Sequence, residues 1–137
     1  MIKTVAILLF GVSLLLASEE FESIQKDYFK SYDYERVGKY KEAIKTLSPL
    51  YSKYPKGYTL NLRLGWLFYL KKNYNDSIKY YKKASLIDTY AFDPKLGLIR
   101  VYLATYSYED AQNVSTELLK IDYYNYYANL YMSKALI

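Results

Sequence analysis

The chain has 137 residues, of which 52% are hydrophobic and 24% charged, and its formal net charge is +5. It contains no cysteine and no histidine, which excludes disulfides, thiol nucleophiles, zinc sites of the Cys/His kind and the commonest general base. Three prolines and five glycines are all that interrupt it, so the composition favours one helical domain with a mildly basic surface.

Residues 1–18 are predicted to form a leader segment. One early lysine precedes an apolar run from Val5 to Leu16, and the small residues Ala17 and Ser18 follow. The run is shorter than the roughly 20 residues that span a bilayer, but it is typical of a secretory signal peptide. Signal peptides usually carry small residues at two positions before the cleavage site, and cleavage after Ala17 or Ser18 would place a leucine at the outer one. Two alternatives therefore stay open, an uncleaved N-terminal anchor and a buried helix of a cytosolic protein. We expect an exported, periplasmic bacterial protein, membrane-anchored if the leader is not cleaved.

The remaining residues, 19–137, repeat with a period of 34. This period predicts units at about 24–57, 58–91 and 92–125, followed by a terminal helix at 126–137. Residues 34 positions apart form columns, and in three columns the residues match in size and chemistry through all three units. These columns are Tyr34, Phe68 and Tyr102; Tyr40, Tyr74 and Tyr108; and Ala43, Ser77 and Ala111.

The middle unit shows how each period divides into two helices. Leu60, Leu64 and Leu67 recur at helical spacing, which predicts an amphipathic first helix. The polar residues that follow break this stripe, and Asn73 or Asn75 is expected to cap the second helix.

Turn and cap residues in the outer units support the same division. Gly38 is expected to make the turn of the first helix pair, and Pro49 is expected to kink the helix that contains it. In the third unit, Asp93 followed by proline predicts a helix start. Ser107 with Asp110 resembles a capping box that opens the next helix.

The three columns have a packing explanation. Two antiparallel helices approach closely only where a side chain is small, and the third column supplies that residue in every unit. The two aromatic columns are expected to fill the space beside it. Because one helix pair cannot bury its apolar face alone, the units are expected to stack, which gives an all-α fold.

The stretch LGWLFYLKKNYNDSIKYYKKA, at residues 64–84, holds the most specific motif of the chain. Together with the period and the order of elements, it resembles tetratricopeptide repeats over residues 24–125. The resemblance implies antiparallel helix-turn-helix repeats stacked as a short right-handed α-solenoid. The chain departs from the family in the polar residues at the tryptophan position of each unit, Asp27, Asn61 and Lys95.

The resemblance also implies a binding module whose first helices line a concave groove for a peptide or a partner's helix. Carried over column by column, the groove residues are Tyr28, Tyr32, Leu62, Trp66, Tyr69, Leu96, Arg100 and Leu103. Trp, Tyr and Arg are enriched at binding hot spots, although aromatic side chains equally serve packing between helices. Some family members clamp a C-terminal carboxylate with lysine and asparagine. We do not expect that clamp, because Tyr28 and Tyr32 occupy its positions.

We therefore expect a non-catalytic protein–protein interaction module or scaffold in the bacterial envelope, without a cofactor. The sequence has no glycine-rich phosphate loop and no cluster of metal ligands, and adjacent acids such as Glu109 and Asp110 diverge on a helix. The alternatives are a structural subunit of an envelope complex, the repeat region of a longer protein and, less expected, an RNA-binding repeat.

The terminal helix predicts a further interaction. Its apolar residues, among them Leu130 and Tyr131, occupy more than one face. One face is expected to pack on the third unit, and the other would expose apolar side chains, which predicts self-association or a partner there. The expected contacts on the third unit are Leu118, Leu119 and Ile121.

The leader generates the first testable prediction. If it is a signal peptide, mass spectrometry of the mature protein should find an N-terminus at Ser18 or Glu19. An intact Met1 in the membrane fraction would instead support the anchor, and an intact Met1 in soluble cytosol would contradict export.

Overall fold

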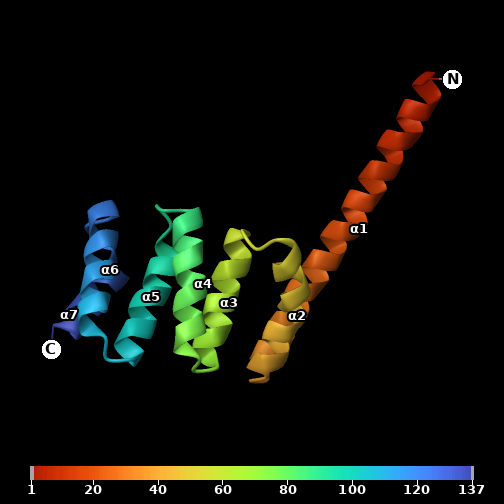
Figure 1. The fold of residues 1–137 in the computed structure, drawn as a ribbon. Helices are drawn as coiled ribbons and strands as arrows, with labels where there is room; N and C mark the ends of the chain where they lie inside the picture. The colour runs from red at the N-terminus through yellow and green to blue at the C-terminus, as the bar shows by residue number, and fades with distance from the viewer. Residues whose placement is uncertain (1, 137) are drawn as a thin grey trace. The chain divides into compact units, whose positions relative to one another are not determined.

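The computed structural model describes the backbone of residues 2–136 and the side chains of residues 15–136. Within residues 2–136 the chain is helical and contains no strand. The helices, drawn in Figure 1, are α1 (Ile2–Arg36), α2 (Tyr40–Lys53), α3 (Tyr58–Leu70), α4 (Tyr74–Ile87), α5 (Phe92–Ala104), α6 (Tyr108–Ile121) and α7 (Tyr126–Ala135).

The helix starts reproduce the period seen in the sequence. The second helices α2, α4 and α6 begin at the tyrosine column, and α3, α5 and α7 also begin at aromatic residues 34 apart. The backbone repeats too, because the three residues with left-handed φ values, Gly38 (72°), Lys72 (63°) and Tyr106 (59°), share one column. In each turn this conformation lets the next amide bond back to the preceding helix, as in a Schellman motif. The predicted repeat and the turn at Gly38 are confirmed.

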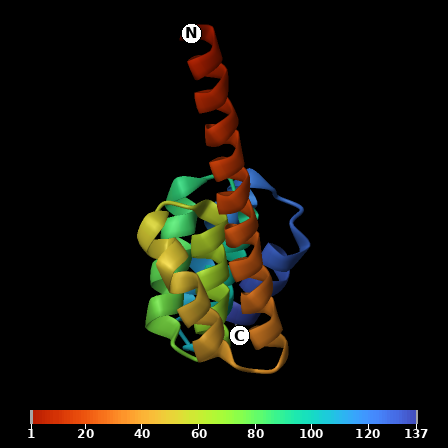
Figure 2. The same ribbon diagram turned by 90° about the vertical axis from the view of Figure 1, so that its right-hand side faces the viewer.

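The chain divides into two compact units, residues 1–47 and residues 48–137. In the first unit, α1 and the start of α2 form the two arms of a hairpin, which Figure 2 shows from the side. Ala43 and Leu47 are fully buried there. The division falls beside Pro49, which lies inside α2 and cannot donate a backbone hydrogen bond.

Helix α1 continues without a break through the predicted leader. Within the described part of the chain, no helix has an apolar stretch long enough to cross a membrane. Most of the leader lies outside the residues whose side chains are described, so the signal peptide and export stay predictions.

The second unit is built in two layers. Contacts join α3 to α4, α4 to α5, α5 to α6 and α6 to α7, and further contacts join α3 to α5 and α5 to α7. Helices α3, α5 and α7 are therefore neighbours in one layer, and α4 and α6 cover one side of that layer. The buried side chains lie between the two layers, which leaves the opposite side of α3 and α5 less covered.

One tyrosine ring occupies the point where α3, α4 and α5 meet. Tyr81 of α4 is 3% exposed, and its ring lies against Gly65 of α3 and Gly97 of α5. A Cβ atom at Gly65 would lie 2.7 Å from the ring, and one at Gly97 would lie 2.5 Å from it. Ser77, one turn earlier, donates a hydrogen bond of 2.7 Å to the Gly65 carbonyl. The ring fits only because both neighbouring helices lack a side chain there.

Three polar residues of one column make the same pair of hydrogen bonds in successive repeats. The side chains of Asn61, Lys95 and Asn129 lie 34 residues apart, and each donates to the backbone carbonyls six and four residues earlier. The distances are 3.1 and 2.8 Å for Asn61, 2.5 and 3.5 Å for Lys95, and 3.1 and 3.0 Å for Asn129. These bonds join the loop that enters each repeat to its first helix. A tryptophan could not make both bonds, because its indole has a single N–H donor.

The predicted helix caps have a mixed outcome. Asn73 caps α4, because its side chain accepts a hydrogen bond of 3.3 Å from the Asp76 amide. The capping box at Ser107 is wrong: Ser107 occupies the N-cap position, but its hydroxyl lies 3.1 Å from the Thr105 hydroxyl and makes no cap bond.

The predicted start of α5 is also wrong by a small shift. The helix begins at Phe92, with Ala91 as its N-cap residue, and not at an Asp93 cap. Asp93 instead lies in the first turn, where its carboxylate still stabilises the positive end of the helix dipole.

The Tyr81 contact generates a stability prediction. Gly97→Ala should lower the free energy of unfolding by about 1–3 kcal/mol, because the new methyl group would overpack the buried ring. Urea denaturation followed by circular dichroism measures the change. Combining Gly97→Ala with Tyr81→Leu should reduce the cost of the glycine substitution, since the smaller side chain leaves room.

Helix propensity alone predicts the opposite sign. Alanine is favoured over glycine by about 1 kcal/mol in a helix interior, so a stabilised Gly97→Ala variant would show that the ring does not contact this backbone.

Candidate functional site

Helices α3 and α5 each present a partly exposed stripe beside buried residues. On α3 the stripe contains Leu62, Trp66 and Tyr69, while the residues between them, such as Leu64 and Gly65, are buried. The equivalent stripe on α5 contains Leu96, Arg100 and Leu103. We call these six residues the α3–α5 face. They include every predicted groove residue that lies in residues 48–137.

The aromatic residues of the α3–α5 face stack on each other and contact a third ring on α4. The rings of Trp66 and Tyr69 lie 5.6 Å apart at an angle of 25°. The ring of Tyr69 lies 6.0 Å from that of Tyr74, the first residue of α4. All three are half-buried, so each ring is fixed on one side by the core and partly open on the other. Such fixed, amphipathic rings lose little conformational entropy when a partner binds.

Arg100 links α5 to this stack. Its guanidinium group lies over the Trp66 ring, 5.3 Å from the ring centroid, which is a cation–π contact. It makes no ion pair with any carboxylate of residues 15–136. Arg100 also lies near the buried Tyr81 phenol, whose pKa is raised far above its usual range by burial. That phenol therefore stays neutral, and it leaves Arg100 as the charged group of the face.

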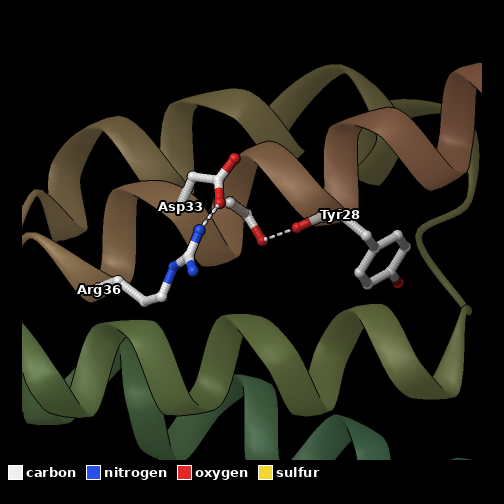
Figure 3. Close-up of polar contacts among 4 residues, drawn as sticks. Tyr28, Asp33 and Arg36 are labelled. Carbon is white, nitrogen blue, oxygen red and sulfur yellow. Dashed lines mark hydrogen bonds and ion pairs between the residues drawn. The ribbon is translucent and has the colours of Figure 1, made fainter.

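The two predicted groove residues on α1 belong to the first unit. Tyr28 is half-buried and Tyr32 is 47% exposed. Figure 3 shows polar contacts on this part of α1: the Tyr28 carbonyl accepts a hydrogen bond of 2.8 Å from the Ser31 hydroxyl, and Arg36 pairs with Asp33. The role of the two tyrosines as groove residues stays a prediction.

The small residues of the repeat are fully buried. Ala43, Ser77 and Ala111 each have 0% exposure. The aromatic residues around them are less uniform, because their burial depends on neighbouring rings. Tyr102 is buried, while Tyr34, Tyr40, Tyr74 and Phe68, whose ring stacks 5.3 Å from that of Tyr80, are half-buried.

Tyr108 does not pack as the sequence predicted. It is 44% exposed, and its ring contacts the exposed Tyr106 ring at 6.2 Å. The equivalent Tyr74 is covered by Tyr69, but one period later that covering position holds Leu103, which is smaller and has no ring.

The terminal helix α7 contacts α6, as the sequence predicted. Leu118 is fully buried and Leu119 packs against the same core. Ile121 is 37% exposed, and its contact with α7 stays a prediction.

The predicted groove columns did not extend to two residues of α7. Leu130 and Lys134 continue, with the same 34-residue step, the columns that hold Leu96 and Arg100. Leu130 is half-buried and Lys134 is exposed. Extending the period by one unit would have found both, because α5 and α7 are neighbours in one layer.

The side chains that the structure describes offer no group of three or more acidic residues that could hold a metal ion. The α3–α5 face presents aromatic rings, leucines and the guanidinium group of Arg100.

No protein-family model and no curated protein sequence matches the chain. Solved structures do match its fold. The first tetratricopeptide-repeat domain of human RPAP3 superposes with a TM-score of 0.71 and 17% identity, covering 80% of this chain and 87% of that one.

Two further solved structures contain bound ligands. The first such domain of Spaghetti (RPAP3), bound to the HSP90 peptide SRMEEVD, has a TM-score of 0.74 and 16% identity, covering 84% of this chain and 91% of that one. PcrH in complex with the chaperone-binding region of PopD has a TM-score of 0.68 and 14% identity, covering 83% and 86%. The chain thus has the all-α, helix-turn-helix fold of tetratricopeptide-repeat domains.

Proposed function

We propose that the protein is a non-catalytic interaction module that binds a peptide or a helical segment of a partner protein against the α3–α5 face. The observation that carries this proposal is the position of Trp66. It is the only tryptophan of the chain, and its ring is half-exposed, stacked on Tyr69 and covered at one side by Arg100. Tryptophan, tyrosine and arginine in one fixed cluster are the composition of a binding hot spot.

The solved structures support a partner that is a protein. Their shared fold holds an HSP90 peptide in one case and a segment of PopD in another. A fold can host unrelated functions, so the support for this chain comes from its own face, where apolar area and an unpaired cation lie on adjacent helices.

The cellular setting is part of the proposal. The apolar leader supports export to the bacterial envelope, as a periplasmic protein or as one held at the membrane by an uncleaved anchor. The absence of histidine and cysteine from the sequence supports a role in binding without catalysis and without a cofactor. A structural subunit of an envelope complex would use the same face as an assembly surface.

Self-association is a second interaction that α7 favours. Exposed apolar side chains gather at this end of the second unit, and patches of this kind mark interaction sites. The most exposed are Tyr123 (74%), Tyr124 (87%), Tyr126 (70%) and Leu136 (68%). Light scattering at micromolar concentration, on the wild type and a Tyr126→Glu variant, distinguishes a self-associating protein from a monomer.

The proposed function predicts the effect of removing the indole. Trp66→Ala should weaken partner binding by at least about 2 kcal/mol, because the ring is the largest fixed contact of the face. Pull-down from an envelope extract finds the partner, and titration of that partner measures the change. Circular dichroism should show unchanged helix content.

Tyr90→Ala is the matched control, since Tyr90 is 77% exposed in the loop between α4 and α5 and lies outside the face. Equal binding by the wild type and Trp66→Ala would contradict the proposal. Binding of RNA that falls steeply with salt would favour the nucleic-acid alternative instead.

A further inference from the structure

The α3–α5 face extends onto α7. Two columns run across the three first helices with a step of 34 residues: Leu62, Leu96 and Leu130 in one, and Trp66, Arg100 and Lys134 in the other. Contacts join α3 to α5 and α5 to α7, so the columns cross adjacent helices of one layer. The second column changes in character along the layer, from an aromatic ring on α3 to a cation on α5 and another on α7.

Both cations lie over aromatic rings. The Arg100 guanidinium is 5.3 Å from the centroid of Trp66, and the Lys134 ammonium is 5.7 Å from that of Tyr131. Neither forms an ion pair with a carboxylate among the described side chains. A ring attracts a cation through its face without accepting its N–H groups as a carboxylate does, so these donors stay available to an anion.

The charges of the three first helices in this unit are one-sided. Helices α3, α5 and α7 together carry Arg63, Lys95, Arg100 and Lys134, against one acid, Asp93. Lys95 is occupied by loop carbonyls, and Arg63 is 6% exposed. Arg100 and Lys134 are therefore the accessible cations, and Asp93 is an exposed acid in the first turn of α5. Helices α4 and α6 instead carry both signs, with four acids and four lysines, Asp76, Glu109, Asp110, Glu117, Lys79, Lys82, Lys83 and Lys120.

We propose that the α5–α7 part of this layer recognises an acidic–apolar segment of a partner protein. Two carboxylates pair with Arg100 and Lys134, and apolar side chains beside them pack on Leu96 and Leu130. The proposal rests on the proposed function and adds the chemical class of the ligand. A planar guanidinium already held by a ring favours a carboxylate, which it can bind through two parallel hydrogen bonds.

The same observations favour a protein over a nucleic acid. Affinity for a phosphate backbone rises with the number of phosphates neutralised, and this surface offers only two accessible cations, Arg100 and Lys134. The half-buried Leu96 and Leu130 would instead gain from apolar side chains of a ligand.

The test is a selection of binders from a random peptide library on the wild-type protein. The library is displayed in two formats, with free carboxyl termini and with blocked ones. We expect enriched peptides in both formats to place Asp or Glu beside apolar residues. Arg100→Gln and Lys134→Gln should each weaken a selected peptide about tenfold, the usual size of a hydrogen bond to a charged group.

Lys79→Gln is the matched control. Lys79 is exposed and lies 5.3 Å from the centroid of Tyr80, so it repeats the cation–ring contact on α4, outside the face. Its loss should leave peptide affinity unchanged. An effect as large as that of the Arg100 and Lys134 variants would overturn the proposal, because it would reflect net charge and not this surface.

The remaining outcomes separate this inference from the proposed function. Enriched peptides that bind through Trp66 but lack acids would overturn the acidic ligand and leave the binding module intact. Enrichment only with free carboxyl termini would place one anion at a chain end and overturn the two-carboxylate arrangement. If no peptide depends on Trp66, or if an oligonucleotide binds through both cations more tightly than any peptide, both proposals fail.

Discussion

The second unit depends on a single close packing contact, the ring of Tyr81 between Gly65 and Gly97. Because neither glycine has a side chain, α3 and α5 both approach the ring of the helix that covers them. Trp66 follows Gly65 directly, and Arg100 lies one turn after Gly97. The same contact therefore brings neighbouring residues of two repeats together, and the Arg100 guanidinium lies 5.3 Å from the centroid of the Trp66 ring.

Structure and proposed function thus share the same helices. The side of α3 and α5 that faces α4 and α6 packs against small residues and leucines of those helices, such as Ser77 and Leu118, which are fully buried. Trp66 and Tyr69 pack against the core and stay partly exposed. We expect side chains held in this way to lose little conformational freedom when a partner binds.

The sequence predicted the features that recur at a fixed step. The helix starts, the turn at Gly38 and the small-residue column all follow from the period of 34. It could not predict features that do not repeat. Gly97 is the only glycine of its column, and the contact of Arg100 with Trp66 depends on how two repeats pack against each other. The cap at Ser107 failed because a neighbouring hydroxyl, Thr105, competes for the same side chain. The period also reaches Leu130 and Lys134, but the groove columns were followed over three repeats only and did not include them.

The most direct measurement is hydroxyl-radical footprinting of the full chain with and without a peptide selected on it. The central claim, that the uncovered side of α3, α5 and α7 is the binding surface, predicts protection of Trp66, Tyr69 and Tyr131 by the peptide. Tyr51 and Tyr80, whose rings lie 5.3 Å apart beside Lys83, should remain unchanged. Protection of these two tyrosines with an unchanged Trp66 would place the binding surface on the other layer and contradict the account.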